Sequence, residues 1–150
     1  MERSEQAVAK FVSGFNCAQS VLFSFCDDLG LDKDNALKLA CGFGAGMGRK
    51  EEVCGAVTGG IMVIGAKYGR GENDERKATE VTYAKIRELM DKFAQKHGTY
   101  ICRQLLNGCE LTSEEGQKTY LANDYFNQVC KPCVTSVVEI LEVLISNDQG

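Results

Sequence analysis

The segment from Val53 to Ala66 constrains the fold of this chain most, because it is apolar nearly all round yet only 14 residues long. A helix with no polar face must be buried on every side, and a membrane span needs about 20 residues. Gly55 and Gly59 lie four residues apart. Small residues at this spacing line one helix face and let a second helix approach closely. A buried strand is the competing interpretation, but the glycines favour a central, buried helix.

Helical periodicity covers most of the remaining chain, and we find no convincing strand pattern. A first helix is expected between Asn16, a residue type that caps helix N-termini, and Gly30, which favours a C-terminal stop. Helical spacing predicts further helices at 34–41, 74–97 and 101–106, a polar segment at 110–127, and a final helix from about Pro132. The sequence therefore predicts an all-α fold, a compact helical bundle around the small-residue-rich central helix, as one domain over residues 1–150.

Charge and hydropathy narrow the class of protein. The net charge is −4 and no basic patch stands out, so we expect no nucleic-acid partner. The first ten residues carry Glu2 and Glu5 without a continuous apolar run, which is not the pattern of a signal peptide. No segment reaches the length of a membrane span. We therefore expect a cytoplasmic protein.

Eight cysteines are the main chemical feature of the sequence, against one histidine and no tryptophan. A domain of about this length buries ~70% of the surface that its unfolded chain exposes, so it does not need disulfides to hold a small core together. In an intracellular chain, cysteines more often bind metal or carry out redox chemistry. The single histidine excludes a histidine-rich metal site.

Cys54 is the leading candidate nucleophile because it opens the predicted central helix. Free N–H groups and the helix dipole at an N-terminus stabilise a thiolate. Arg49 and Lys50 would add to this effect, whereas Glu51 and Glu52 would oppose it. The alternative is that Cys54 packs as a small buried hydrophobe.

Cys130 and Cys133 form a C-x-x-C motif at the start of the final predicted helix. Two such cysteines can close a disulfide, and the first thiol then gains from the helix N-terminus as in thioredoxin-type motifs. The same motif supplies half of a zinc or iron–sulfur site. The βαβ context of thioredoxin is absent here. Two unrelated core thiols are the third interpretation.

The remaining cysteines are less informative. Cys17 and Cys26 lie on opposite sides of one predicted helix, so Cys17 is free to reach another segment. Cys102 has helical spacing with the apolar residues that follow it and is expected to face inward, while Cys109 is expected in a turn. For Cys26 and Cys41 we favour simple packing.

His97 continues the apolar stripe of the long 74–97 helix and is followed by Gly98. We interpret it as a helix-end histidine favoured by the helix dipole. The alternatives are a metal ligand or a base for Cys102.

Several of these segments together resemble the C_GCAxxG_C_C family of putative redox-active proteins, which are small proteins of about this whole length. The resemblance rests on four ordered segments and on a C-terminal cysteine before Val134; the segments are 14–21, 42–49, 52–59 and 102–105. The label spells Gly-Cys-Ala where this chain reads Cys-Gly-Ala. The resemblance implies a redox role without an established substrate. It implies a shared cysteine quartet, with Cys133 additional, and the quartet is Cys17, Cys54, Cys102 and Cys130.

Three hypotheses use these thiols, which we expect to converge near the start of the central helix. The first is a thiol–disulfide oxidoreductase without a cofactor, in which Cys54 attacks, one of Cys17, Cys102 and Cys130 resolves, and Cys133 completes the motif. The second is a zinc or iron–sulfur protein for storage or electron transfer, with Cys17, Cys54, Cys102 and Cys130 as ligands. The third is a binding module whose thiols only sense redox state. The expected partner is a redox protein or a small molecule, and a homo-oligomer is compatible with the sequence.

Overall fold

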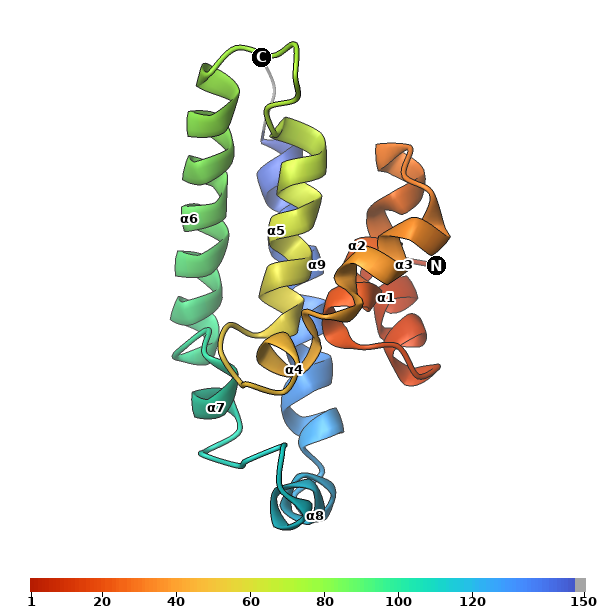
Figure 1. Ribbon diagram of the computed structural model, residues 1–150, viewed down its shortest axis with the longest axis vertical. Coiled ribbons are helices and arrows are strands. Elements are labelled where there is room, and N and C mark those ends of the chain that lie inside the picture. The colour runs from red at the N-terminus through yellow and green to blue at the C-terminus, as the bar shows by residue number, and fades with distance from the viewer. Residues whose placement is uncertain (148–150) are drawn as a thin grey trace.

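The computed structural model describes residues 1–147, and these residues fold into helices without any strand (Figure 1). The only β-type pairing among them is an isolated antiparallel bridge between Val53 and Ile101. The all-α prediction is therefore confirmed. The helices are α1 (Arg3–Val12), α2 (Cys17–Leu29), α3 (Lys33–Cys41), α4 (Gly44–Met47), α5 (Gly55–Tyr68), α6 (Lys77–His97), α7 (Cys102–Leu105), α8 (Glu114–Ala122), the π-helix η1 (Phe126–Cys130) and α9 (Lys131–Ser146).

Helix α5 is the predicted central helix, and it packs against α2, α6 and α9. Its glycines face the closest neighbours. A Cβ atom at Gly59 would lie 2.7 Å from the carbonyl oxygen of Ala18 in α2, and one at Gly60 would lie 2.8 Å from Val137 in α9. Contacts this short leave no room for a side chain. The small-residue pattern thus allows α2 and α9 to lie directly on α5, as the sequence predicts.

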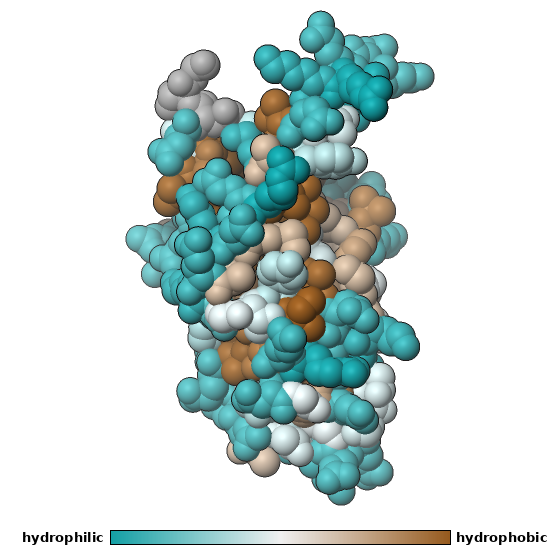
Figure 2. Space-filling view, turned by 90° about the vertical axis from the view of Figure 1, so that its left-hand side faces the viewer, coloured by the Kyte–Doolittle hydropathy of each residue, from teal (hydrophilic) through white to brown (hydrophobic). Residues whose placement is uncertain are grey.

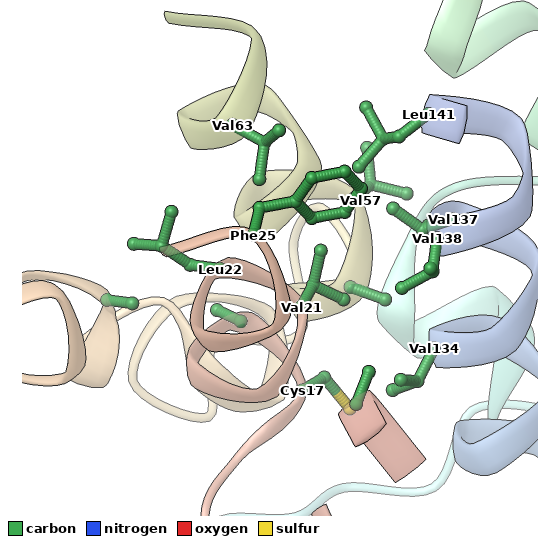
Figure 3. Close-up of a cluster of buried hydrophobic side chains, with 14 of the residues drawn as sticks. Cys17, Val21, Leu22, Phe25, Val57, Val63, Val134, Val137, Val138 and Leu141 are labelled. Atoms are coloured by element: carbon green, nitrogen blue, oxygen red, sulfur yellow. The ribbon is translucent and has the colours of Figure 1, made fainter. Parts of the chain in front are cut away.

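The main hydrophobic core fills the space between α2, α5 and α9 (Figure 3). Phe25 and Val21 of α2 point toward Val57 of α5 and toward Val137 of α9. Cys17 lies at one end of this core, beside the start of α9. The same packing that buries the core therefore sets the position of a sequence-predicted thiol.

The start of α2 is fixed by a capping box. The Asn16 side chain accepts a hydrogen bond from the Gln19 backbone N–H at 2.9 Å, and the Gln19 side chain accepts one from the Asn16 N–H at 2.9 Å. The Asn16 amide also donates to the carbonyl oxygen of Cys41 at 2.8 Å, which ties the start of α2 to the end of α3. Gly30 ends α2 in the left-handed conformation with φ of 65°. Both predicted boundaries are confirmed, and Cys17 becomes the first residue of the helix.

The N-terminal helix α1 was not predicted from the sequence. It buries Ala7 and Phe11, which lie four residues apart on one face, and it docks on α2 and α9; this helical spacing could have revealed it. The polar segment at 110–127 contains α8, which begins after a serine cap whose hydroxyl accepts from the Gly116 N–H at 2.9 Å. The π-helix η1 then runs directly into α9. Helix α9 begins at Lys131, next to Pro132 as predicted, and η1 precedes it without a break.

Hydrophilic side chains dominate the side of the molecule on which α6 lies, with apolar residues visible between them (Figure 2). Val81 and Tyr83 of α6 are among the exposed apolar and aromatic residues. Exposed apolar residues of this kind are ordinary on protein surfaces. Within residues 1–147, no helix combines the length and the apolar character that crossing a membrane requires.

The close contact between α2 and α5 predicts the effect of a single added methyl group. Gly59→Ala should lower the free energy of unfolding by about 1–3 kcal/mol, because the new Cβ would overlap the α2 backbone. Gly65→Ala is the matched control in the same helix, where a Cβ meets nothing within 4 Å. It should raise the free energy of unfolding by up to about 1 kcal/mol through helix propensity. Urea unfolding followed by circular dichroism measures both, and equal stability of the two variants would contradict the packing described here.

Candidate functional site

A cavity of about 330 Å³ lies where the starts of α2, α5 and α9 meet α4, α7 and α8. Five cysteines line it, and each comes from a different place in the chain: Cys17 begins α2, Cys54 precedes α5, Cys102 begins α7, Cys130 ends η1 and Cys133 lies in the first turn of α9. All eight cysteines of the chain are free thiols. The structure thus brings together every cysteine that the sequence analysis selected for the site, while their chemical roles stay predictions.

Cys17 and Cys130 form the first thiol pair. The Cys17 thiol hydrogen-bonds to the Cys130 sulfur, which raises the pKa of Cys17 well above its ordinary value and lowers the pKa of Cys130 to about 7. Burial raises the pKa of Cys17 further and opposes the shift at Cys130. Because the two pKa values move apart, this pair holds one thiol and one thiolate near neutral pH.

Tyr120 supports the thiolate of this pair. Its hydroxyl donates to the Cys130 sulfur at 3.4 Å and contributes to the lowered pKa of Cys130. Burial, and then the neighbouring Cys130, raise the pKa of Tyr120, so the hydroxyl stays protonated and remains a donor. The sequence analysis assigned no role to Tyr120, because it lies in the polar 110–127 segment where no spacing links it to the C-x-x-C motif.

Cys54 and Cys133 form the second thiol pair. Their hydrogen bond is the main cause of a lowered pKa at Cys54 and of a strongly raised pKa at Cys133. The backbone N–H groups of Ala56 and Val57, in the first turn of α5, lower the pKa of Cys54 further. The expected effect of the helix N-terminus on Cys54 is therefore present, although it is smaller than the effect of Cys133.

Cys102 lines the same cavity as a protonated thiol. Burial raises its pKa to about 12, and the charges of Cys54 and Cys130 add to the shift. Its backbone N–H donates to the carbonyl oxygen of Glu52 at 2.6 Å, which holds α7 against the segment before α5. Cys102 therefore stays neutral beside the two pairs.

Glu51, one of the charged residues before Cys54, has partners elsewhere in the structure. The Glu51 carboxylate accepts a hydrogen bond from the Leu111 N–H at 2.9 Å and lies 3.9 Å from Arg103. It raises the pKa of Cys102 and is not among the causes of the shift at Cys54. One oxygen of this carboxylate therefore has other partners, and its expected opposition to a Cys54 thiolate stays a prediction.

The expected lowering of the Cys130 pKa by a helix N-terminus is wrong. Cys130 has helical backbone angles and closes η1, so the preceding helix continues into α9 instead of leaving a free N-terminus. Its lowered pKa comes from the hydrogen bonds of Cys17 and Tyr120. The two cysteines of the C-x-x-C motif therefore do not pair with each other. Each of them pairs with a different cysteine elsewhere in the chain.

The alternating glycine segment forms one wall of the cavity in an unusual conformation. Every residue from 45 to 49 has a positive φ, between 53° and 70°. Glycine adopts these angles freely, but the three non-glycine residues, Ala45, Met47 and Arg49, are strained there. The turn is closed by the Glu52 N–H, which donates to the Gly46 carbonyl at 2.9 Å. This conformation brings Ala45 and Arg49 to the cavity.

The other cysteines lie outside the cavity. Cys26 is buried in α2, where its thiol donates to the Leu22 carbonyl at 3.4 Å, as the packing role predicts. Cys109 is buried in a small second core and donates to the Gly116 carbonyl at 3.0 Å. Cys41 is exposed at the end of α3, so its expected packing role is wrong.

His97 is the last residue of α6, as expected. Its Nε2 atom lies 2.9 Å from the Ser136 hydroxyl, and its ring packs on Phe93 with ring centroids 4.5 Å apart. Burial and the nearby Lys96 lower the pKa of His97. Its polar partner in the structure is therefore a serine of α9.

The donor groups of the described residues are arranged in pairs. Among residues 1–147, no group of three or more histidine, cysteine, aspartate or glutamate side chains is placed to hold a metal ion. The two cysteine pairs hydrogen-bond within themselves instead.

The pKa values predict which thiol reacts first. Cys130 should be alkylated fastest near neutral pH, because its pKa is about 7 and its side chain is only half-buried. Iodoacetamide labelling against pH, quantified for each cysteine by mass spectrometry, should place its midpoint near pH 7. Tyr120→Phe should move that midpoint upward and slow labelling at pH 7, because the thiolate loses a donor.

Tyr125→Phe is the control for this experiment, since the Tyr125 ring packs against Tyr120 but its hydroxyl lies by Asn107. It should leave the midpoint of Cys130 unchanged. The same midpoint in Tyr120→Phe and in the unaltered protein, or a midpoint at the ordinary thiol value, would contradict the proposed hydrogen bonding of Cys130.

The chain matches the model of one known protein family. The model of a family described as "Putative redox-active protein (C_GCAxxG_C_C)" matches residues 15–144, a range that includes all five cysteines of the cavity. No curated protein and no solved structure matches the chain.

Proposed function

The chain belongs to the C_GCAxxG_C_C family of putative redox-active proteins, and from this premise we propose that it is a thiol–disulfide oxidoreductase. The observation that carries the proposal is the pairing of four thiols around one cavity, Cys17 with Cys130 and Cys54 with Cys133. In each pair one pKa is raised and the other lowered. An attacking thiolate and a protonated resolving thiol are the two states that disulfide exchange requires.

Cys130 is the attacking residue in this proposal. Its pKa is lowered to about 7, and it is the only one of the five cavity cysteines that is not buried. A thiol whose pKa lies near the ambient pH is the most effective attacking group, because it is both ionised and nucleophilic. Its thiolate attacks one sulfur of a substrate disulfide, forms a mixed disulfide and releases the first substrate thiolate.

Cys17 then completes the reaction. Its thiol loses a proton, which passes to the released substrate thiolate, and its sulfur attacks Cys130 in the mixed disulfide. The second substrate thiolate leaves and takes up a proton from solvent. Two protein thiols are oxidised to one Cys17–Cys130 disulfide, and one substrate disulfide is reduced to two thiols.

The second pair regenerates the first. Cys133 lies three residues after Cys130 on a continuous helical segment, which corresponds to a rise of about 4.5 Å. Its thiol loses a proton and its sulfur attacks Cys130 in the Cys17–Cys130 disulfide, and the freed Cys17 thiolate takes up that proton. Cys54, the hydrogen-bonded partner of Cys133, then attacks Cys133 and frees Cys130. The result is a Cys54–Cys133 disulfide and a reduced first pair.

This scheme assigns Cys54 a resolving role, whereas the sequence analysis assigned it the first attack. The reason is its partner: the thiol that hydrogen-bonds to Cys54 is Cys133, a residue of the C-x-x-C motif. The zinc or iron–sulfur alternative needs four thiolates around one centre. Two separate hydrogen-bonded pairs favour the dithiol reaction over that alternative.

The two pairs predict how many thiols a mild oxidant removes. Full oxidation with excess oxidised dithiothreitol or diamide should convert the four paired thiols, out of the eight in the chain, to disulfides, and a reducing dithiol should restore them. Alkylation in denaturant followed by mass spectrometry should identify Cys17–Cys130 and Cys54–Cys133 links. Oxidation of the Cys133→Ser variant should remove only two thiols, those of Cys17 and Cys130.

Cys26→Ser is the matched control, because Cys26 is buried in α2 away from the cavity, and it should behave as the unaltered protein does. Unchanged thiol numbers after oxidation would contradict the proposed reaction. Stoichiometric zinc or iron in anaerobically purified protein, released as the thiols are modified, would replace it with the metal-binding alternative.

A further inference from the structure

The size and lining of the cavity identify a class of substrate. Its volume of about 330 Å³ lies at the lower end of the range of small-molecule sites, about 300–1,000 Å³. Besides the thiols, most of its wall is apolar, and the larger apolar residues are Phe11, Leu105, Leu106, Leu111, Leu121 and Val129. A cavity of this size and polarity fits one small molecule with an apolar body.

Most polar side chains of the wall are already engaged. The Asn16 amide donates to the Cys41 carbonyl, the Gln117 amide donates to the Leu111 carbonyl at 3.1 Å, and the Tyr120 hydroxyl donates to Cys130. These side-chain donors therefore already have partners within the protein.

Arg49 is different from these residues. It is the only residue of the wall with a charged side chain other than the cysteines, and within residues 1–147 its guanidinium has no ion pair or hydrogen bond. Its side chain is exposed, as is Leu121, which is 76% exposed although it also lines the cavity. Residues that are both exposed and part of the wall lie at the mouth. An arginine there can bind a carboxylate through two parallel hydrogen bonds.

We propose that the cavity binds a small aliphatic disulfide with an apolar body and one carboxylate, with its carboxylate on Arg49 at the mouth and its disulfide on Cys130 inside. The inference rests on the proposed thiol–disulfide reaction and names its substrate class. A cyclic dithiolane with a short alkyl chain and a terminal carboxylate is the simplest molecule of this kind. The protein dithiol gives up two electrons and two protons and becomes the Cys17–Cys130 disulfide, and the dithiolane takes them up and becomes its dithiol.

Lipoate and lipoamide test the proposal, because they share the dithiolane ring and the alkyl chain and differ in the carboxylate. Oxidation of the reduced protein under anaerobic conditions should be about tenfold faster with lipoate at concentrations below saturation. Such a ratio corresponds to about 1.4 kcal/mol, within the range for a hydrogen-bonded ion pair. Arg49→Gln should remove this preference and leave the lipoamide rate unchanged, and Arg49→Lys should keep part of it.

Gln and Lys are matched replacements, because both must adopt the same positive φ, 67° in the present structure. Binding of octanoate, which has the chain and the carboxylate but no disulfide, gives a second measurement that does not depend on redox chemistry. Isothermal titration calorimetry should detect octanoate binding that Arg49→Gln weakens about tenfold.

The outcomes separate the substrate class from the reaction. Reversible oxidation of four thiols, with equal lipoate and lipoamide rates in every variant, would overturn the substrate class and leave the reaction intact. Reduction of a protein disulfide such as that of insulin, without reaction of either dithiolane, would overturn it as well. Octanoate binding that depends on Arg49, in a protein whose thiols do not oxidise, would overturn the reaction and retain a carboxylate site in the cavity.

Discussion

The direct contact between α2 and α5 is the interaction on which both the core and the cavity depend. Glycines of α5 face α2, and a Cβ atom at Gly55 would lie 3.3 Å from the Cβ of Cys17. The first turn of α5 therefore sits against the first residue of α2. Because α9 packs on the same two helices, its start also reaches this point and brings Cys130 and Cys133 with it. The cysteines meet because three helices begin at one end of a tightly packed core.

Burial and hydrogen bonding together give the two thiols of each pair different pKa values. In a low-dielectric interior an isolated thiolate is unfavourable, so burial by itself raises the pKa of every thiol in the cavity. A hydrogen bond from a neighbouring thiol reverses this at the acceptor and reinforces it at the donor. Cys130 and Cys54 are the acceptors and have lowered pKa values, while Cys17 and Cys133 are the donors and have raised ones. Each pair can therefore hold a single negative charge, although the charge on Cys130 opposes the one on Cys54 across the cavity.

The sequence predicts those structural features that depend on the residues of a single helix. The cap at Asn16, the stop at Gly30 and the small-residue face of α5 are local patterns, and the structure confirms them. The partner of each thiol is a property of several helices. Helical spacing shows that Cys17 is free to face another segment, but it does not choose between partners on α7, η1 and α9. The link between Cys54 and Cys133 and the donation from Tyr120 to Cys130 arise from packing that no single-helix pattern contains.

The glycine-rich wall connects backbone strain with the placement of Arg49. A non-glycine residue in the left-handed conformation is disfavoured by roughly 1–2 kcal/mol, so five successive positions of this kind would be hard to maintain. Glycine at positions 46 and 48 removes this penalty at two of them. The Glu52 N–H closes the turn onto Gly46, and a Cβ at Gly46 would lie 2.5 Å from the Cα of Glu51, so no other residue fits there. Alternation of glycine with larger residues therefore lets the backbone turn sharply while Arg49 still carries a side chain to the cavity mouth.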